Sequence, residues 1–155
     1  MESRTSFDLE TFLPYRLNRA AETISRAFQR FYRERHGLTR PEWRALAALG
    51  SRGSMTATQI GAHSFMHKTK VSRAVQSLEE RRWLVRQRGA ADRRLEHLTL
   101  TDQGQRAYRE IIDLAIAYEQ ALERSLGETA AHALKQGLSA IEATMPDARS
   151  DSLPD

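Results

Sequence analysis

Residues 84–100 carry the pattern of a β-hairpin in a chain whose other segments follow helical spacing. Residues 84–88 suggest one short strand, and residues 95–100 alternate apolar and polar side chains as a returning strand does. The Gly-Ala-Ala-Asp segment at 89–92 is typical of a turn. The sequence therefore predicts a mainly α fold with a small two-stranded β wing.

Capping signals indicate where several helices begin. Thr39 with Glu42, and Thr56 with Gln59, have the spacing of a capping box, in which two side chains satisfy backbone N–H groups at the helix start. Gly37 suits the left-handed end of the first helix. Together with the spacing of apolar residues, these signals predict helices over about 14–36, 40–50, 56–63, 68–81, 101–126 and 128–145.

The predicted helix at 68–81 has one apolar and one polar face, because its residues follow the helical period. Arg73 can bind guanine through two hydrogen bonds, and Gln76 can bind adenine in the same way. Lys68 and Lys70 flank this face and can reach phosphates. The apolar stripe consists of Val71, Ala74, Val75 and Leu78, and the polar face of Thr69, Ser72, Arg73 and Gln76.

Positive charge is concentrated in the middle of the chain. The 155 residues carry a formal net charge of +4, which divides into +2 over residues 1–39, +8 over 40–109 and −6 over 110–155. Such asymmetry indicates a nucleic-acid-binding segment joined to a part with another role, or else a solvated basic face. Arginine accounts for 21 of the 24 basic residues. This bias suits phosphate and guanine contacts, but it also follows from genome base composition.

The order of two helices, a polar-faced helix and a hairpin is that of a winged helix-turn-helix. The polar-faced helix would enter the major groove. The hairpin tip, with Arg86, Arg88, Arg93 and Arg94, would lie along the minor groove, where a narrow groove attracts guanidinium groups. The alternative is that the helix presents only a solvated surface. The residues predicted to contact DNA are Thr56, Lys68, Thr69, Lys70, Ser72, Arg73, Gln76, Arg86, Arg88, Asp92, Arg93 and Arg94.

Over residues 12–145 the chain resembles the MarR-type transcriptional regulators. The most specific part is the segment KTKVSRAVQSLEERRWLVRQRGAADRRLEHLTLTDQG at 68–104. The resemblance implies that Arg73 sits in the major groove, that Arg94 reaches the minor groove and that Asp92 orients the wing arginines. Arg82 departs from the pattern, because the family often has glycine there. We therefore expect the end of that helix to differ locally.

The helices that flank the winged module are too long and too apolar for such a module alone. They either close onto their own monomer or pack against a second subunit, and the resemblance implies an obligate homodimer. Two-fold symmetry demands an inverted-repeat operator, with recognition helices about 34 Å apart. The expected organisation is a dimerisation helix at 1–37, a winged helix-turn-helix lobe at 38–101, dimerisation helices at 102–146 and a polar tail at 147–155.

The chain contains no cysteine, which excludes a disulfide scaffold, a thiolate metal site and the thiol-oxidation sensing found in this family. His63 and His67 have a spacing that binds metal on a continuous helix, but a turn is expected between them. We expect no metal site and no cofactor, while a metal-responsive regulator is kept as an alternative. No catalytic constellation stands out in the sequence, so no enzyme is expected.

A small-molecule effector is the remaining mode of sensing that the resemblance implies, in a pocket between the dimer helices and the DNA-binding lobe. Such a pocket needs a cationic group for an anion and aromatic side chains for a ring. The segment FLPYRLNRAAETISRAF at 12–28 resembles relatives that sense aromatic carboxylates or their CoA thioesters. The candidate ligand-binding residues, each of which core packing or surface charge also explains, are Tyr15, Arg16, Arg19, Trp43 and Arg44.

These features predict a dimeric, sequence-specific transcription regulator that binds double-stranded DNA. It is expected to be a repressor that an anionic aromatic ligand, or its CoA thioester, releases. The alternatives are an architectural DNA-binding protein without a specific operator and an enzyme that uses the helical pocket. Since no stretch approaches the ~20 apolar residues of a membrane helix and the N-terminus lacks a signal-peptide core, we expect a cytoplasmic protein without a membrane partner.

Overall fold

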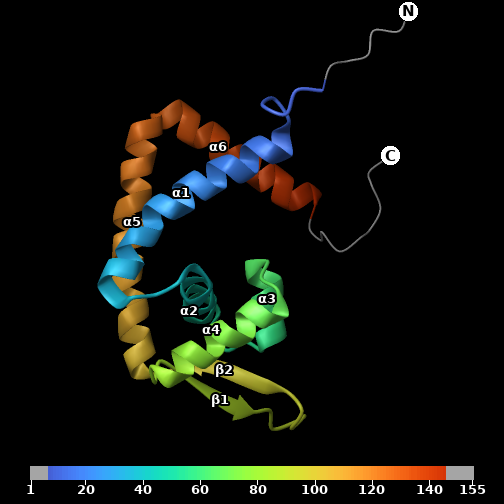
Figure 1. Cartoon of the computed structure of the whole chain (residues 1–155), viewed down its shortest axis with the longest axis vertical. Coiled ribbons are helices and arrows are strands. Elements are labelled where there is room, and N and C mark those ends of the chain that lie inside the picture. The colour runs from blue at the N-terminus through green and yellow to red at the C-terminus, as the bar shows by residue number, and fades with distance from the viewer. Residues whose placement is uncertain (1–6, 146–155) are drawn as a thin grey trace, which may run out of the picture. The chain divides into compact units, whose positions relative to one another are not determined.

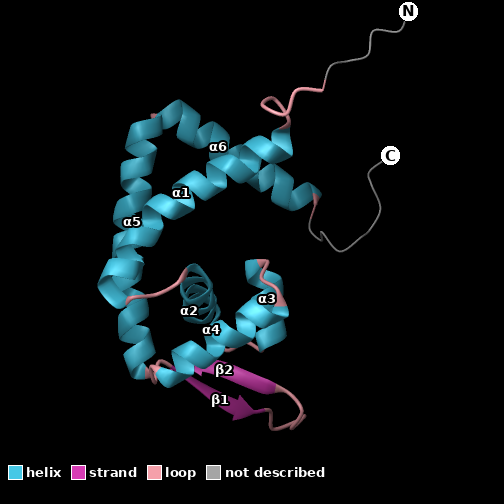
Figure 2. Ribbon diagram, in the orientation of Figure 1, coloured by secondary structure: helices cyan, strands magenta, loops and turns pink. Residues whose placement is uncertain are grey.

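The computed structural model describes residues 7–145 (Figure 1). Its elements, in chain order, are α1 (Leu13–His36), α2 (Arg40–Arg52), α3 (Ala57–Ser64), α4 (Lys68–Glu80), β1 (Leu84–Arg88), β2 (Glu96–Leu100), α5 (Asp102–Leu126) and α6 (Glu128–Thr144). The strands pair antiparallel, and the other described elements are helices (Figure 2). The predicted mainly α fold with a two-stranded wing is therefore confirmed. Within the described range, no helix is long and apolar enough to cross a bilayer.

The two predicted capping boxes begin α2 and α3. At α2, the backbone N–H of Thr39 donates to the Glu42 carboxylate at 2.7 Å, and the Thr39 hydroxyl accepts from the Glu42 N–H at 3.4 Å. The same exchange joins Thr56 and Gln59 at α3. The first helix ends as predicted at Gly37, whose φ of 65° is a left-handed conformation that glycine adopts without strain.

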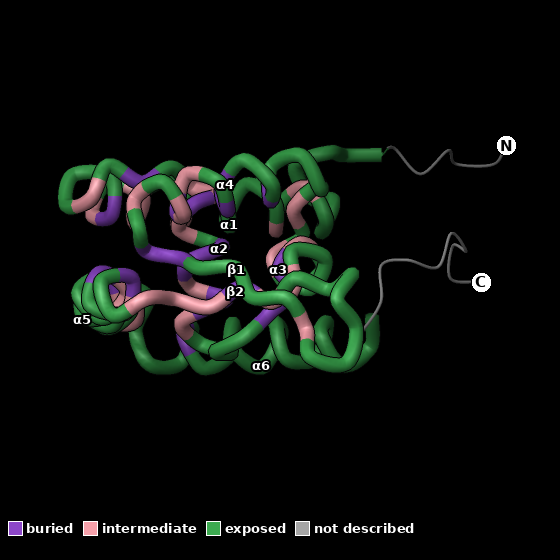
Figure 3. The backbone as a smooth tube through the Cα atoms, turned by 90° about the horizontal axis from the view of Figure 1, so that it is seen from below, coloured by how far each residue is buried: buried purple, intermediate pink, exposed green. Residues whose placement is uncertain are grey.

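One apolar core joins the end of α1 to α2, α3, α4, the wing and the first part of α5. Figure 3 shows the buried residues gathered along these segments, whereas α6 is almost entirely exposed. Burial of these side chains removes apolar surface from water, the largest favourable term in folding. The largest fully buried side chains include Tyr32, Leu46, Leu49, Ile60, Leu78, Leu84, Leu98 and Ile111.

The wing is rooted in this core by alternate residues of its strands. In the register of the sheet, Leu84 pairs with Leu100 and Arg86 pairs with Leu98. Residues directly opposite each other in an antiparallel pair share one face of the ribbon. Met55 extends the ladder on the other side of Leu98, with two backbone hydrogen bonds of 3.1 and 2.8 Å. The base of the wing is therefore held by three segments of backbone.

The connection from α4 to β1 passes through Arg82, whose φ is 62°. The backbone N–H groups of Arg82 and Trp83 donate to carbonyls in the last turn of α4, at 2.8 and 2.9 Å. The expected local difference at this helix end is therefore wrong, because the arginine takes the left-handed conformation that glycine favours. That conformation costs a non-glycine residue about 1 kcal/mol.

The start of α5 packs directly on that connection. The Thr101 hydroxyl donates to the Arg82 carbonyl at 2.7 Å and accepts from the Gly104 N–H at 3.1 Å, so Thr101 caps the start of α5. A Cβ atom at Gly104 would lie 2.1 Å from the carbonyl oxygen of Trp83. The close approach of the two backbones therefore requires glycine at this position.

The described chain divides into two compact units, one up to Leu114 and one from Ala115 onward. In the second unit, the end of α5 and α6 form a helical hairpin at Gly127, with Lys135 paired to Glu119 and Glu123. The last helix predicted at 128–145 carries an apolar stripe, which is 38–64% exposed at Leu134, Leu138, Ile141 and Met145. The predicted polar tail at 147–155 lies outside the described residues.

Candidate nucleic-acid interface

The helix α4 presents the polar face that its sequence predicts. Its apolar stripe, with Val71 and Leu78 at 2% and 0% exposure, packs into the core. An outward surface of charged or hydrogen-bonding groups is what a helix needs to contact base edges and phosphates. The exposed side chains on this surface are Lys68, Thr69, Lys70, Ser72, Arg73 and Gln76. Gln76 also donates a hydrogen bond of 3.0 Å to Glu80, which orients its amide along the helix.

The N-terminus of α4 is capped by His67. Its Nδ1 accepts a hydrogen bond from the Thr69 N–H at 3.3 Å. This cap was not predicted from the sequence, because imidazole is not one of the side chains preferred at this position. Phe65, two residues before His67, has a φ of 50° and an exposed side chain. The turn thus aims the first residues of α4, including Lys68 and Lys70, away from the core.

A buried carboxylate fixes the other half of α4. Glu42 accepts hydrogen bonds from the Thr39 N–H at 2.7 Å and from the Ser77 hydroxyl. Burial by itself raises the pKa of Glu42, but the hydrogen bonds from Ser77 and Thr39 outweigh it and hold the pKa below the ordinary range. The start of α2 is thereby tied to the polar-faced helix through one ionised side chain. Sequence analysis recognises Glu42 as a cap but gives no sign of Ser77, 35 residues away.

Arg81, just after α4, connects the C-terminal end of α4 to the C-terminal end of α1. Its guanidinium donates to the carbonyl oxygens of His36 at 2.7 Å and Gly37 at 3.2 Å, and lies 5.3 Å from the centre of the Trp83 ring. The last carbonyls of α1 lack partners within their own helix, so a cation there is well placed. The orientation of α4 is therefore coupled to the end of α1.

The tip of the wing is shaped by Asp92. One of its carboxylate oxygens accepts a hydrogen bond of 2.9 Å from the backbone N–H of Arg94. The Gly89 N–H donates to the Leu95 carbonyl at 2.8 Å and closes the turn. Arg93 and Arg94 are both exposed there. Asp92 therefore orders the backbone that carries Arg94. This contact is compatible with the role that the resemblance implies for Asp92, the orientation of the wing arginines.

Arg86 is not at the wing tip, so its expected place there is wrong. It lies in the middle of β1, opposite Leu98, with its guanidinium paired to two carboxylates. Arg88, two residues nearer the turn, is exposed. Thr56, the remaining predicted contact, is half-buried, and its hydroxyl accepts from the Gln59 N–H at 3.2 Å.

The five predicted ligand-binding residues do not come together. Arg19 pairs with Glu10 at 2.7 Å and lies 5.7 Å from the centre of the Tyr15 ring. Arg16 is an exposed residue of the first turns of α1. Trp43 stacks on Tyr32 with a ring separation of 5.6 Å. Trp43 and Arg44 together line a cavity of about 520 Å³ between α2, α3 and α5, and a small one of about 70 Å³ beside Tyr32.

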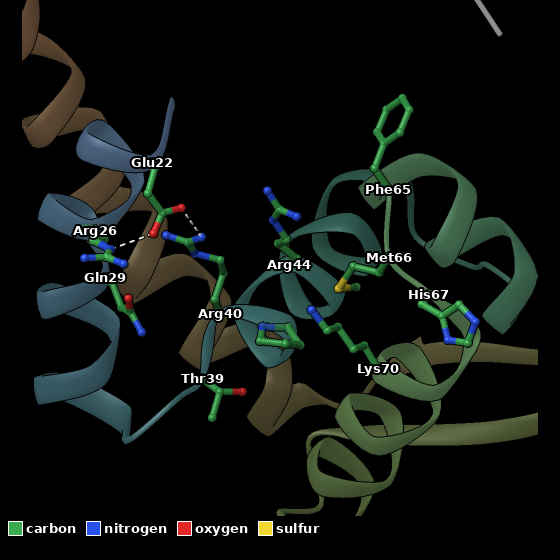
Figure 4. Close-up of a pocket in the computed structure, with 11 residues that line it drawn as sticks. Glu22, Arg26, Gln29, Thr39, Arg40, Arg44, Phe65, Met66, His67 and Lys70 are labelled. Carbon is green, nitrogen blue, oxygen red and sulfur yellow. Dashed lines mark hydrogen bonds and ion pairs between the residues drawn. The ribbon is translucent and has the colours of Figure 1, made fainter. Parts of the chain in front are cut away.

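A larger cavity, of about 780 Å³, lies between α1, the start of α2 and the α3–α4 turn. Figure 4 shows its polar wall, where Glu22 bridges Arg26 and Arg40 at 2.6 and 2.8 Å. Hydrogen bonds from Arg40 and Arg26 lower the pKa of Glu22 to about 2. Arg44 and Lys70 line the cavity as well. Arg44 is one of the predicted ligand-binding residues, whereas Glu22, Arg26 and Arg40 were not predicted, because only the packing of separate helices brings them together.

The two histidines considered for a metal site are separated by the turn. His67 commits its Nδ1 to the start of α4, and His63 lies in the last turn of α3. Within residues 7–145, no three histidine or carboxylate side chains gather as metal ligands.

Comparisons with known proteins place this geometry among DNA-binding regulators. The MarR family pattern matches residues 36–95. The uncharacterized HTH-type transcriptional regulator YwoH of Bacillus subtilis (strain 168) is 28% identical over 110 residues, which are 71% of this chain and 79% of that protein. The repressor CouR, solved bound to a 23-mer DNA duplex, has a TM-score of 0.75 and 26% identity over 90% of this chain and 99% of its own. NadR, solved with 4-hydroxyphenylacetate, has a TM-score of 0.73 and 22% identity over 91% and 97%.

Proposed function

We propose that this chain, which belongs to the MarR family of winged-helix transcriptional regulators, is a homodimeric repressor of transcription. Regulators of this family bind DNA and are not enzymes. The protein would act in the cytoplasm by occupying an inverted-repeat operator. A small anionic aromatic molecule, or its CoA thioester, would release it. An architectural protein that coats DNA and a metal-responsive regulator are the rival functions.

One observation carries the DNA-binding mode: the exposed side chains of α4 are all polar, whereas its apolar stripe is buried. Arg73 lies at the centre of that surface and would read guanine in the major groove. The wing would reach the adjacent minor groove with Arg93 and Arg94, and Arg88 would contact phosphates near it. The related repressor CouR, with the same fold, is solved on DNA.

The exposed stripe of α6 supports the homodimer. Leu134, Leu138 and Ile141 are more than a third exposed, and a row of such residues on one helix is typical of an association surface. A two-fold dimer presents its two α4 helices to successive major grooves, about one turn of DNA apart. The operator would therefore be an inverted repeat.

The chemistry of the cavities supports an anionic aromatic effector. Arg44 lines both the 780 Å³ and the 520 Å³ cavity, so its cation is available to either. Lys70 adds a second positive charge, and Trp43 an aromatic surface. Lys70 also belongs to the DNA-facing helix, so an anion bound beside it would compete with phosphate. NadR, which shares the fold, is solved with a hydroxylated aromatic acid.

A thermal-shift screen of aromatic acids and CoA thioesters tests the effector. A ligand that binds only the folded protein raises its melting temperature, and the same compound should release DNA. Arg44→Gln should reduce the shift, whereas Arg33→Gln, an exposed change outside both cavities, should retain it. If no compound in the panel raises the melting temperature of the wild type, the proposed effector class is wrong.

Two arginine substitutions test the docking mode. Arg73→Ala should cost on the order of 1–3 kcal/mol of operator binding and relax the base preference, because it removes a base contact. Arg94→Ala should weaken binding to all sequences and flatten the dependence of affinity on salt. Gel-shift titrations at several salt concentrations measure both effects. Unchanged operator affinity in both variants would refute the docking.

A further inference from the structure

Arg86 carries a guanidinium on the wing, as Arg88, Arg93 and Arg94 do, but its surroundings differ. It lies opposite Leu98 in the sheet register, two residues after Leu84. Leu84 and Leu98 are both 1% exposed. Because alternate residues of a strand point to the same face, Arg86 shares a face of the ribbon with the buried Leu84 and Leu98, although its own side chain is 37% exposed.

The guanidinium of Arg86 spans two elements. Its Nε donates to the Glu79 carboxylate in α4 at 3.0 Å, and one of its terminal nitrogens donates to the Glu96 carboxylate in β2 at 3.1 Å. These hydrogen bonds raise the pKa of Arg86, so the guanidinium stays charged at every pH at which the protein is studied. Arg86 therefore links three segments: its own strand, the returning strand and the DNA-facing helix.

The charge balance of this cluster disfavours contact with phosphate. One guanidinium faces two carboxylates, so the Arg86–Glu79–Glu96 triad carries a net negative charge. For Arg86 to reach DNA, it would have to leave both partners, and the carboxylates would then face the phosphates unpaired. Arg94, in contrast, has its backbone ordered by Asp92 while its side chain extends from the wing tip.

We propose that Arg86 is a positioning residue that locks the wing to α4, and that it contributes no phosphate contact of its own. The lock sets the angle between the helix that reads the major groove and the hairpin that reaches the minor groove. The proposal rests on the proposed docking of both elements on DNA. It separates the arginines of the wing into one that orients the hairpin and a set that touches the nucleic acid.

Removing the negative charges of Glu79 and Glu96 should change DNA affinity in opposite directions, depending on whether Arg86 contacts phosphate or positions the wing. If Arg86 contacts phosphate, removing the negative charges of Glu79 and Glu96 frees it and strengthens DNA binding. If Arg86 positions the wing, the same removal loosens the hairpin and weakens DNA binding. The variants are Arg86→Gln, the double variant Glu79→Gln/Glu96→Gln and, as a matched arginine that the proposed function places on DNA, Arg94→Gln.

Two measurements on the full chain decide between these roles. The first is amide hydrogen exchange of β1 and β2 without DNA, with the amides of α2 as an internal reference. We expect Arg86→Gln and the double glutamate variant to accelerate exchange in the hairpin about two- to fivefold, the range for a partly exposed ion pair, with α2 unchanged. Arg94→Gln should leave the hairpin as it is. Unaltered hairpin exchange in both lock variants would overturn the proposal.

The second measurement is affinity for a duplex of about 21 base pairs as a function of salt. Both lock variants should bind about two- to fivefold more weakly with the wild-type salt slope, whereas Arg94→Gln should lower the slope by about 0.9. A slope lowered by that amount in Arg86→Gln, or tighter binding by the double glutamate variant, would overturn the proposal. A wild type that fails to bind any duplex would instead sink the proposed function, and the exchange measurement would still test the lock.

Discussion

The helices α4 and α6 have similar sequence patterns and opposite surroundings. Each places four apolar side chains at helical spacing along one stripe. In α4 the stripe from Val71 to Leu78 is at most 3% exposed, whereas in α6 and just beyond it the stripe from Leu134 to Met145 is at least 38% exposed. The stripe of α4 is buried by other residues of its own chain, whereas the stripe of α6 is not covered by the described residues.

This difference shows what helical periodicity establishes. The pattern identifies which face of a helix is apolar, since that depends only on spacing. It does not identify what covers that face, because the covering residues are far away in sequence or belong to another chain. The buried stripe of α4 leaves its polar surface free for DNA, and the exposed stripe of α6 is what we propose a second subunit covers.

The largest expected effect comes from the buried stripe. Leu78→Ala should lower the free energy of unfolding by about 2–5 kcal/mol, because it removes a fully buried side chain and leaves a cavity. Leu95→Ala makes the same chemical change at a residue that is 48% exposed, and should cost less than about 1 kcal/mol. Urea denaturation followed by circular dichroism compares the two variants. Equal losses would break the distinction between covered and uncovered apolar residues.

The next effect concerns self-association through α6. The double variant Leu138→Asp/Ile141→Asp places two charges on the exposed stripe, and should weaken dimerisation at least about hundredfold, since burial of unpaired charge is costly. Gln136→Asp/Ser139→Asp adds the same charge to the other side of the helix and should leave association nearly unchanged. Sedimentation equilibrium measures the monomer–dimer balance. A monomeric wild type, or equal dimerisation by both variants, would contradict the proposal that the stripe of α6 forms the dimer interface.

The pH dependence of stability should report on the carboxylate behind α4. The pKa of Glu42 is lowered in the folded protein from an ordinary value of 4.5, so its stabilising contribution is fully present above that value. The contribution is lost as the pH falls through the lowered pKa of the folded state. Glu42→Gln should cost about 1–3 kcal/mol at neutral pH, because it disturbs two hydrogen bonds in a buried place.

The control for Glu42→Gln is Glu80→Gln, an exposed change in α4 itself. Thermal unfolding between pH 7 and the acid range should show a smaller loss on acidification in Glu42→Gln than in the wild type. An identical pH profile in Glu42→Gln and the wild type would show that the carboxylate does not stabilise the helix when ionised.

The smallest expected effect is a gain. Arg82→Gly should raise the free energy of unfolding by about 0.5–1 kcal/mol, because it relieves a non-glycine residue with a φ of 62°. Arg109→Gly makes the same substitution within α5 and should lower the free energy of unfolding by about 1 kcal/mol. Denaturant titrations measure the change in the free energy of unfolding of each variant. A loss of stability in Arg82→Gly would mean that its side chain contributes more than the strain costs.

The local features of the fold follow from the sequence. Thr39 and Thr56 start helices because each hydroxyl, and the carboxylate or amide three residues later, accept hydrogen bonds from backbone N–H groups that have no partner within the helix. The wing and the polar face of α4 follow from periods of two and 3.6 residues. Gly37 ends its helix for an equally local reason.

The features that sequence analysis missed depend on tertiary contacts. Glu42 meets Ser77 only because α2 packs on α4, and Arg86 meets Glu79 only because the wing folds back on the helix. The alternation of the strand places Arg86 on the same face as Leu84, but it does not distinguish Arg86 from Arg88, because only the fold brings Glu79 and Glu96 to Arg86. The ligand candidates on α1 stay a prediction, and their surroundings also depend on contacts distant in sequence, since Arg19 pairs with Glu10.

Footprinting of the 155-residue chain on DNA selected from a random pool tests whether it reads a specific operator. A homodimer that reads DNA with α4 and the wing should protect one inverted repeat, with half-site centres about 10 base pairs apart or a multiple of one turn. Arg73→Ala should blur the preferred bases within that repeat. Uniform protection without a preferred sequence would contradict sequence-specific binding and favour an architectural DNA-binding protein.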